Sequence, residues 1–211
     1  MNSEKKPSIT PTQDGPYLVN GLKNFTNQKG LVDIKDAMAL CRCGGSANKP
    51  FCDGTHSEIG FSSAKLEGRV EDKRENYKGE KIVIHDNRGI CAHAGLCADG
   101  LAAVFDTKEE PWIHPDSAGA DEIIATIRKC PSGALSYTVN EVEHHTGNEE
   151  PSIFIAPNGP YVVSGEPNLV DSTWGEGASK EHFTLCRCGG SKNKPFCDGT
   201  HWYNKFTDDK N

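Results

Sequence analysis

The chain has 211 residues, of which 35% are hydrophobic, and its 30 acidic and 23 basic side chains give a formal net charge of −7. The length fits one or two ordinary domains or several very small ones, and the low apolar content argues against a single large core. The acidic balance excludes the basic face that a nucleic-acid partner needs. Nine cysteines, an odd number, exclude a complete set of intrachain disulfides.

The sequence shows no segment that would target or anchor the protein to a membrane. Its first 15 residues are polar, which predicts no secretory signal. The longest apolar clusters, KIVIH and DEIIATI, are far shorter than the ~20 residues of a membrane span. We therefore expect a cytoplasmic protein without a membrane partner, in which cysteines serve metal sites or redox chemistry.

An internal repeat organises the chain. Residues 41–56 read CRCGGSANKPFCDGTH and residues 186–201 read CRCGGSKNKPFCDGTH, so the two copies differ only at Ala47 and Lys192. Each copy follows a turn and a short predicted strand, DGPYLV in the first and NGPYVV in the second. The repeat predicts two small modules, at residues 10–62 and 152–211.

Different material separates the two copies and predicts a third unit at residues 78–142. Residues 61–80 and 140–150 are polar and charged and are interpreted as linkers. The isoleucines at 123, 124 and 127 have helical spacing, and proline follows the cysteine that ends this segment. The expected elements are a strand at 81–86, a cysteine-containing loop, a strand at 101–106, a helix at 120–129 and a strand at 136–139.

Each repeat has the spacing C-x-C-x8-C-x3-H. Three thiolates and one imidazole at this spacing can converge on one metal centre, and the glycine of CDGTH permits the tight turn between the last two. Zinc and iron both remain open here, because Cys3His is an established zinc set. The predicted ligands are Cys41, Cys43, Cys52 and His56 in the first copy, and Cys186, Cys188, Cys197 and His201 in the second.

Both repeats resemble the CDGSH iron–sulfur domain of mitoNEET-type proteins, whose motif is C-x-C-x2-S/T-x3-P-x-C-D-G-S/T-H. Ser46 and Ser191 fill the S/T position, and Pro50 and Pro195 fill the proline position. The resemblance implies a [2Fe-2S] cluster in each module, held by three cysteines and one histidine. It also implies two β-rich modules paired about a pseudo-two-fold axis, here within a monomer.

The histidine gives such a site its own chemistry. A neutral imidazole in place of a thiolate makes the site less negative and tends to raise its reduction potential. Imidazole also takes up a proton, so we expect proton-coupled electron transfer and loss of the cluster in acid.

The central unit accounts for the other three cysteines, Cys91, Cys97 and Cys130. With the CPSGAL stretch they resemble a divergent single-cluster ferredoxin-like domain over about residues 80–140. Ala94 occupies the position of the middle cysteine, so three thiolates favour [3Fe-4S]. His93 could supply a fourth ligand for [4Fe-4S], or it is only a polar loop residue. A domain without a cluster, carrying free thiols, is a further alternative.

The sequence gives other polar and aromatic residues simpler roles than metal binding or electron relay. The remaining histidines are interpreted as solvated or, for His85, at the edge of the core. The basic residues in and beside the repeated loops either soften cluster charge, guide an acidic partner or are simply solvated. The histidines interpreted as solvated are His114, His144, His145 and His182. The basic residues are Arg42, Lys49, Arg187, Lys192 and Lys194. The aromatic residues Trp174, Trp202, Tyr17 and Tyr161 are interpreted as packing residues.

The sequence therefore predicts an α+β protein in which two β-rich modules flank a small ferredoxin-like domain. Its expected function is one-electron transfer through several iron–sulfur clusters to an unidentified redox protein. The alternatives are a cluster carrier that serves an acceptor protein, a redox or pH sensor, and a structural zinc protein. No nucleophile elbow or nucleotide-binding loop occurs, so we predict no catalytic residue and no enzyme activity.

Overall fold

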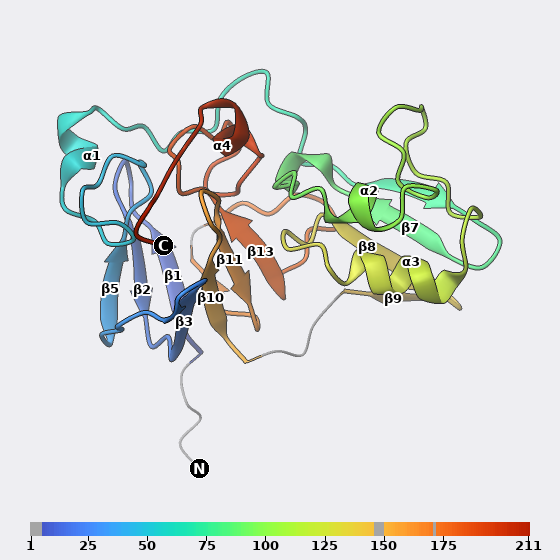
Figure 1. Cartoon of the computed structure of the whole chain (residues 1–211), viewed down its shortest axis with the longest axis horizontal. Helices are drawn as coiled ribbons and strands as arrows, with labels where there is room; N and C mark the ends of the chain where they lie inside the picture. Colours follow the sequence, from blue (N-terminus) through green and yellow to red (C-terminus); the bar gives the residue numbers. More distant parts are fainter. Residues whose placement is uncertain (1–5, 146–149, 171) are drawn as a thin grey trace, which may run out of the picture.

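The computed structural model describes residues 6–145, 150–170 and 172–211 and arranges them as three neighbouring units (Figure 1). The N-terminal module, in blue, lies at one end and the C-terminal module, in orange and red, lies in the middle. The domain from the centre of the sequence, in green and yellow, lies at the other end. The predicted α+β class is confirmed, because each unit has its own sheet and the helices are few and short.

The first sheet belongs mainly to the N-terminal module. Its strands run in the order β12-β1-β2-β5, with β1 (Ser8–Pro11), β2 (Tyr17–Asn20) and β5 (Ala37–Leu40) antiparallel to one another. In β2, Tyr17 and Val19 are buried while the residues between and after them are exposed, which is the alternation of a half-buried strand. The strand β12 (Asn168–Leu169) pairs parallel to β1.

The second sheet repeats this pattern in the C-terminal module. Its order is β13-β11-β10-β3-β4, and its own strands are β10 (Ser152–Ile155), β11 (Tyr161–Ser164) and β13 (His182–Leu185). The strands β3 (Asn24–Asn27) and β4 (Gly30–Leu31) come from the N-terminal module, and β3 pairs parallel to β10.

The two modules thus exchange strands. A strand of the C-terminal module completes the first sheet, and strands of the N-terminal module extend the second. One hydrophobic core runs through both, with side chains such as Phe25, Leu40, Phe183 and Leu185 in a single cluster. This reciprocity confirms the predicted pseudo-two-fold pair and ties the modules into one body.

The central domain has a four-stranded antiparallel sheet in the order β6-β7-β8-β9. Its helix α3, Ala120–Ile127, packs Ile123 and Ile127 into a second core, as the isoleucine spacing predicts. A 3₁₀ turn and a short helix carry the cysteine loop. The bounds are β6 Glu75–Lys78, β7 Val83–Asp86, β8 Leu135–Val139, β9 Val142–His144, the 3₁₀ turn Arg88–Ile90 and α2 Leu96–Gly100.

The predicted strand at 101–106 is wrong. Backbone N–H groups of Val104 and Phe105 both donate to the carbonyl of Leu101 at 3.0 Å, so this segment is a turn, with one isolated bridge between Phe105 and Ile113. Both Val104 and Phe105 are buried. A short apolar run indicates burial but does not distinguish a strand from a buried turn.

The two polar segments interpreted as linkers also contain strands. Residues 75–78 form β6 and residues 142–144 form β9, the two edges of the central sheet. Asn140 and Glu141 have φ of 50° and 65°, as in the tight hairpin turn between β8 and β9. Edge strands are commonly charged, which explains why their composition resembles that of a linker. Residues 146–149 of the second predicted linker lie outside the described residues.

Within the described ranges, no helix combines the length and the apolar character that crossing a membrane requires. The repeated cysteine motifs end in two one-turn helices, α1 (Thr55–Glu58) and α4 (Thr200–Tyr203). Both helices follow a glycine in the left-handed region, Gly54 with φ 94° and Gly199 with φ 81°. A non-glycine residue is strained in this conformation, so the CDG turn explains the abrupt start of each helix.

Candidate metal centres

The repeated cysteine motif forms the same loop in both modules. In the first, the strand β5 leads directly into Cys41, whose N–H donates to the carbonyl of Pro50 at 2.8 Å. The N–H of Cys52 donates to Ala39 at 2.8 Å, so the third cysteine is fixed beside the strand that carries the first. The second loop repeats these bonds from Cys186 to Pro195 and from Cys197 to Thr184.

The predicted ligands come together in pairs. The Sγ atoms of Cys41 and Cys43 are 3.8 Å apart, as are those of Cys186 and Cys188. Two sulfurs on one tetrahedral metal at about 2.3 Å lie about 3.8 Å apart, so this spacing fits a shared metal ion.

The third cysteine and the histidine form the other pair of each set. Cys52 Sγ lies 3.3 Å from His56 Nδ1, and Cys197 Sγ lies 3.4 Å from His201 Nδ1. A sulfur and a nitrogen on one tetrahedral metal lie about 3.5 Å apart. In both modules Nδ1 is therefore the imidazole nitrogen that faces the thiol.

The second cysteine of each set is prepared to ionise. Hydrogen bonding from the thiol of Cys41 lowers the pKa of Cys43 to about 6, and Cys186 has the same effect on Cys188. The backbone N–H of Gly45 also donates to Cys43 Sγ, at 3.4 Å, as does that of Gly190 to Cys188. Thiolate, and not thiol, is the form that binds metal.

An aspartate closes each cluster loop. The carboxylate of Asp53 accepts hydrogen bonds from the N–H of Ala47 at 2.8 Å and from both the N–H and the hydroxyl of Thr55. These bonds hold the pKa of Asp53 below its ordinary value. Asp198 makes the same bonds to Lys192 and Thr200. The aspartate of CDGTH is therefore a loop-fixing residue.

A tyrosine from each module supports the cluster loop of the other. The hydroxyl of Tyr17 contacts the carbonyls of Cys186 at 2.9 Å and Pro195 at 3.0 Å. Tyr161 contacts those of Cys41 and Pro50, both at 3.0 Å. Both tyrosines are fully buried. The sequence predicts them as packing residues, but it does not reveal that they act across the pair.

The arginine between the first two cysteines is buried in both copies, which corrects its interpretation as a solvated or partner-guiding residue. Arg42 is 2% exposed and donates to the carbonyls of Gly15 and Thr12. Arg187 is 1% exposed and donates to Gly159 and Ala156. In both modules the guanidinium therefore contacts the turn that opens the module.

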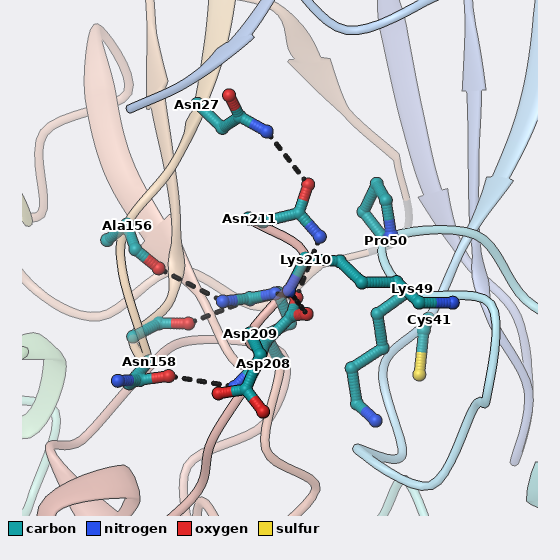
Figure 2. Close-up of polar contacts among 12 residues, drawn as sticks. Asn27, Cys41, Lys49, Pro50, Ala156, Asn158, Asp208, Asp209, Lys210 and Asn211 are labelled. Carbon is teal, nitrogen blue, oxygen red and sulfur yellow. Dashed lines mark hydrogen bonds and ion pairs between the residues drawn. The ribbon is translucent and has the colours of Figure 1, made fainter. Parts of the chain in front are cut away.

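The C-terminal tail forms an ion pair with the second arginine and contacts both CDGSH-like modules. Asp208 forms a buried ion pair with Arg187, and its N–H donates to Asn158 Oδ1 at 2.8 Å (Figure 2). Further along, the Asn27 amide donates to Asn211 at 3.0 Å. Lys210 Nζ donates at 2.8 Å to the carbonyl of Ala47, inside the first cluster loop. The tail thus reaches the N-terminal module at its candidate metal site.

The three cysteines of the central domain line one cavity of about 120 Å³. Cys91 precedes the loop, Cys97 lies in α2, and Cys130 follows α3. Burial raises the pKa of Cys91 to about 11 and also raises that of Cys97. Thiols in such a place need a neighbouring positive charge or a metal to ionise.

Two charged residues beside this cavity are not identified from the sequence. Arg88 stacks on Trp112 at 3.9 Å and places Nη1 at 3.8 Å from Cys91 Sγ. Asp86 lines the same cavity and is 2% exposed, and burial raises its pKa to about 6. Its carboxylate lies 3.7 Å from Arg88 Nε. Both precede Cys91 closely, but no spacing rule marks them.

His93 and Ala94 also line the central cavity. The N–H of His93 donates to Cys91 Sγ at 3.4 Å, and its φ is 54°. The imidazole packs against the C-terminal module as well, since a Cβ added to Gly199 would lie 2.7 Å from its Cδ2. His93 is thus a contact residue, and its service as a fourth ligand stays a prediction.

The structure also places the other histidine, lysine and tryptophan residues interpreted from the sequence. His85 and His182 are buried, and the ring of His85 contacts Asn76 and Thr138 at 2.6 and 2.8 Å. His144 lies in β9 and stacks on Tyr137. Lys194 is buried and donates to the carbonyl of Ser191, so the interpretation of Lys194 and His182 as solvated residues is wrong. Trp174 packs in the core, whereas Trp202 is 61% exposed and packs against the ring of His201, with 5.0 Å between the ring centroids.

Comparison with known proteins agrees with this arrangement. Residues 14–57 and 158–202 match the sequence profile of a family described as "Iron-binding zinc finger CDGSH type". Residues 77–140 match one described as "Divergent 4Fe-4S mono-cluster". The chain belongs to the CDGSH iron-binding family. Its two CDGSH modules flank the mono-cluster domain, as the resemblance of the repeats implies.

Two relatives of this CDGSH protein come from Escherichia coli. Both are named YjdI, from strain K12 and from O157:H7, and both are described as uncharacterized. Each is 44% identical over 61 residues, which cover 29% of this chain and 80% of the relative. The family matches make this chain an iron–sulfur cluster-binding protein.

Proposed function

We propose that this CDGSH protein is a one-electron transfer protein that holds two Cys3His [2Fe-2S] clusters and a central [3Fe-4S] or [4Fe-4S] cluster. The observation that carries the proposal is the grouping of each Cys3His set into two metal-spaced pairs, 3.8 Å for the sulfurs and 3.3–3.4 Å for sulfur and nitrogen. When bound, iron–sulfur clusters accept and return single electrons.

The pairing favours a two-metal centre over zinc. A single tetrahedral ion would draw all four ligands within about 4 Å of one another. In the described part of the chain, no group of three His, Cys, Asp or Glu side chains is placed to hold one metal ion. Two ligands for each of two irons is the arrangement that this spacing supports.

The residues around each set suit electron transfer better than catalysis. Three thiols and one imidazole fill four coordination positions in each module and leave none for a substrate. The loops that carry them are fixed by Asp53, Asp198 and the two crossing tyrosines. A rigid site lowers the structural change that accompanies a change of charge. We therefore propose no enzyme activity and no catalytic residue.

A cluster carrier, or a redox or pH sensor, is the second candidate function. The observation in its favour is that His56 is half-buried, so one ligand of the N-terminal set is accessible from solvent. In either role we propose that the chain acts as a cytoplasmic monomer with an internal pseudo-dimer. Its partner would be a redox protein or a cluster-acceptor protein, and neither nucleic acid nor membrane.

Metal analysis of the full chain tests the proposal. We expect about two iron ions and two acid-labile sulfides per CDGSH module. We also expect an EPR signal from the oxidised central cluster if that cluster is [3Fe-4S]. Zinc without sulfide contradicts the proposal. Faster transfer of a [2Fe-2S] cluster to an apo-ferredoxin than reduction of a redox partner favours the carrier role.

A further inference from the structure

The two CDGSH loops touch each other beside their ligands. Gly44 follows Cys43 and Gly189 follows Cys188, both with positive φ. A Cβ added to Gly189 would lie 2.3 Å from the carbonyl oxygen of Cys43, and one added to Gly44 would lie 2.7 Å from that of Cys188. The two ligand sets therefore meet backbone to backbone across the pseudo-two-fold axis.

The central domain touches the loop of the C-terminal module in a comparable way. His93 lies two residues after Cys91, and Gly199 lies between Cys197 and His201. A Cβ on Gly199 would lie 2.7–2.9 Å from three atoms of His93. The indole N–H of Trp202 donates to the carbonyl of His93 at 3.1 Å. This contact again joins two ligand-bearing loops.

Two further bonds fix the same junction. The buried amide of Asn193 donates to the carbonyl of Gly89 at 2.7 Å. The ring Nε2 of His182 lies 3.1 Å from the carbonyl of Cys130, and can donate to it. Cys91 and Cys130 both pack against the core shared by the CDGSH modules. The central ligand set is thus held to the C-terminal module on two sides.

The corresponding loop of the N-terminal module is more exposed to solvent. A Cβ added to Gly54 would meet nothing within 4 Å, although Gly54 is the sequence counterpart of Gly199. Gly54 is exposed and His56 half-buried, whereas Gly199 is buried and His201 is 5% exposed. Figure 1 agrees, since the C-terminal module lies between the other two units.

We propose that His93, Gly199 and Trp202 are positioning residues that set the order of the three metal centres as central domain, C-terminal module, N-terminal module. The C-terminal set is the middle one, although the central domain is the middle of the sequence. This inference rests on the proposed function, because it concerns the clusters that these ligands would hold.

Magnetic coupling in EPR spectra of the reduced full chain tests the order. We expect Cys188→Ala, which damages the middle set, to remove the coupling of both outer centres. The matched variant Cys43→Ala should leave the central and C-terminal centres coupled. Persistent coupling of the central centre in Cys188→Ala, or its loss in Cys43→Ala, overturns the proposed order.

Two glycine variants test the junction itself. Gly199→Ala and Gly54→Ala place the same methyl group at similar φ, 81° and 94°, so they share the backbone strain. Only Gly199→Ala pushes a methyl into His93. Compared with Gly54→Ala at matched iron and sulfide content, we expect it to weaken the coupling between the central and C-terminal centres. Equal spectra for the two variants overturn the role of the junction.

A milder variant covers the case in which Gly199→Ala loses metal. Trp202→Phe removes the indole N–H from a largely exposed side chain and leaves the CDGTH turn unchanged. It should reduce the same coupling, and an unaltered coupling overturns the inference. If the wild-type chain contains no iron and sulfide, the proposed function fails instead, so the two failures are distinct.

Discussion

The two CDGSH modules carry almost the same cluster loop in very different surroundings. Their ligand pairs have nearly identical spacings, and the only sequence difference within the motif is Ala47 against Lys192. Yet Cys197, Gly199 and His201 are buried, whereas their counterparts Cys52, Gly54 and His56 are partly or fully exposed. Local sequence therefore determines the ligand geometry, and the packing of a third unit determines which site meets solvent.

The modules differ again just outside the motif. Among the described residues, Arg187 has a buried acidic partner, Asp208, while Arg42 contacts carbonyls and the rings of Tyr17 and Phe61. The amide of Asn204 lies close to Gly190 and lowers the pKa of Cys188, and the counterpart of Asn204 is the apolar Ile59, which lies close to Gly45. From these substitutions we expect the two similar sites to differ in stability and electrostatics.

The largest expected difference is in the loss of iron. In the dithionite-reduced protein at neutral pH, a ferrous chelator should remove iron from the N-terminal module first, because His56 is half-buried and His201 is buried. A difference of about 1.4 kcal/mol in the cost of local opening gives about a tenfold difference in rate. Stopped-flow absorbance should show two phases. Variants that lack Cys43 or Cys188 assign the phases, and a faster C-terminal phase would contradict this expectation.

Replacement of the buried arginine should lower the free energy of unfolding by a different amount in each module. Arg187→Met leaves Asp208 as an unpaired buried charge and should lower the free energy of unfolding by about 3–5 kcal/mol. Arg42→Met leaves only carbonyls unsatisfied and should cost about 1–3 kcal/mol. Urea denaturation measures both values. The double variant Arg187→Met/Asp208→Asn should recover part of the loss, and equal losses for the two single variants would refute the distinction.

The reduction potentials of the two modules should also differ. A hydrogen bond to a ligating sulfur stabilises the reduced, more negative state, so Asn204 should raise the potential of the C-terminal site. One bond of about 1 kcal/mol corresponds to roughly 40 mV for one electron. EPR-monitored titration should show a drop in Asn204→Ile and a rise in the reciprocal Ile59→Asn. Unchanged potentials in both variants would exclude this cause.

The smallest expected effect is a loss of folding stability in acid that arises in the central domain. It must be measured separately before the acid stability of the two modules is compared. Burial lowers the pKa of His85 in the central domain. The unfolded chain, with a pKa of about 6.5, then takes up the proton first as pH falls, so stability is full above about pH 6.5 and declines below it. His85→Gln should lose less stability than wild type between pH 7.5 and 5.5 in urea denaturation. The exposed His144→Gln is the control, and an equal decline in all three proteins would refute the assignment.

The sequence predicts best where the signal is local. The isoleucines at 123 and 127 predict the helix Ala120–Ile127, and the apolar run after the repeated turn predicts the strand Tyr17–Asn20. The prediction fails at 101–106, where a buried turn has the composition of a strand. It also fails at the edge strands Glu75–Lys78 and Val142–His144, whose polarity reflects an exposed edge.

The spacing of cysteine and histidine, read from the sequence alone, determined the two matching ligand sets, because a loop of fixed length and a CDG turn place these side chains by local geometry. Only the tertiary structure decided that the modules exchange strands, that Tyr17 and Tyr161 support each other's loops, and that His93 covers Gly199 but not Gly54. These contacts join residues about 100 or more positions apart. Two nearly identical motifs cannot themselves encode which of them a third unit will cover, so that choice rests on surfaces that form only when the chain folds.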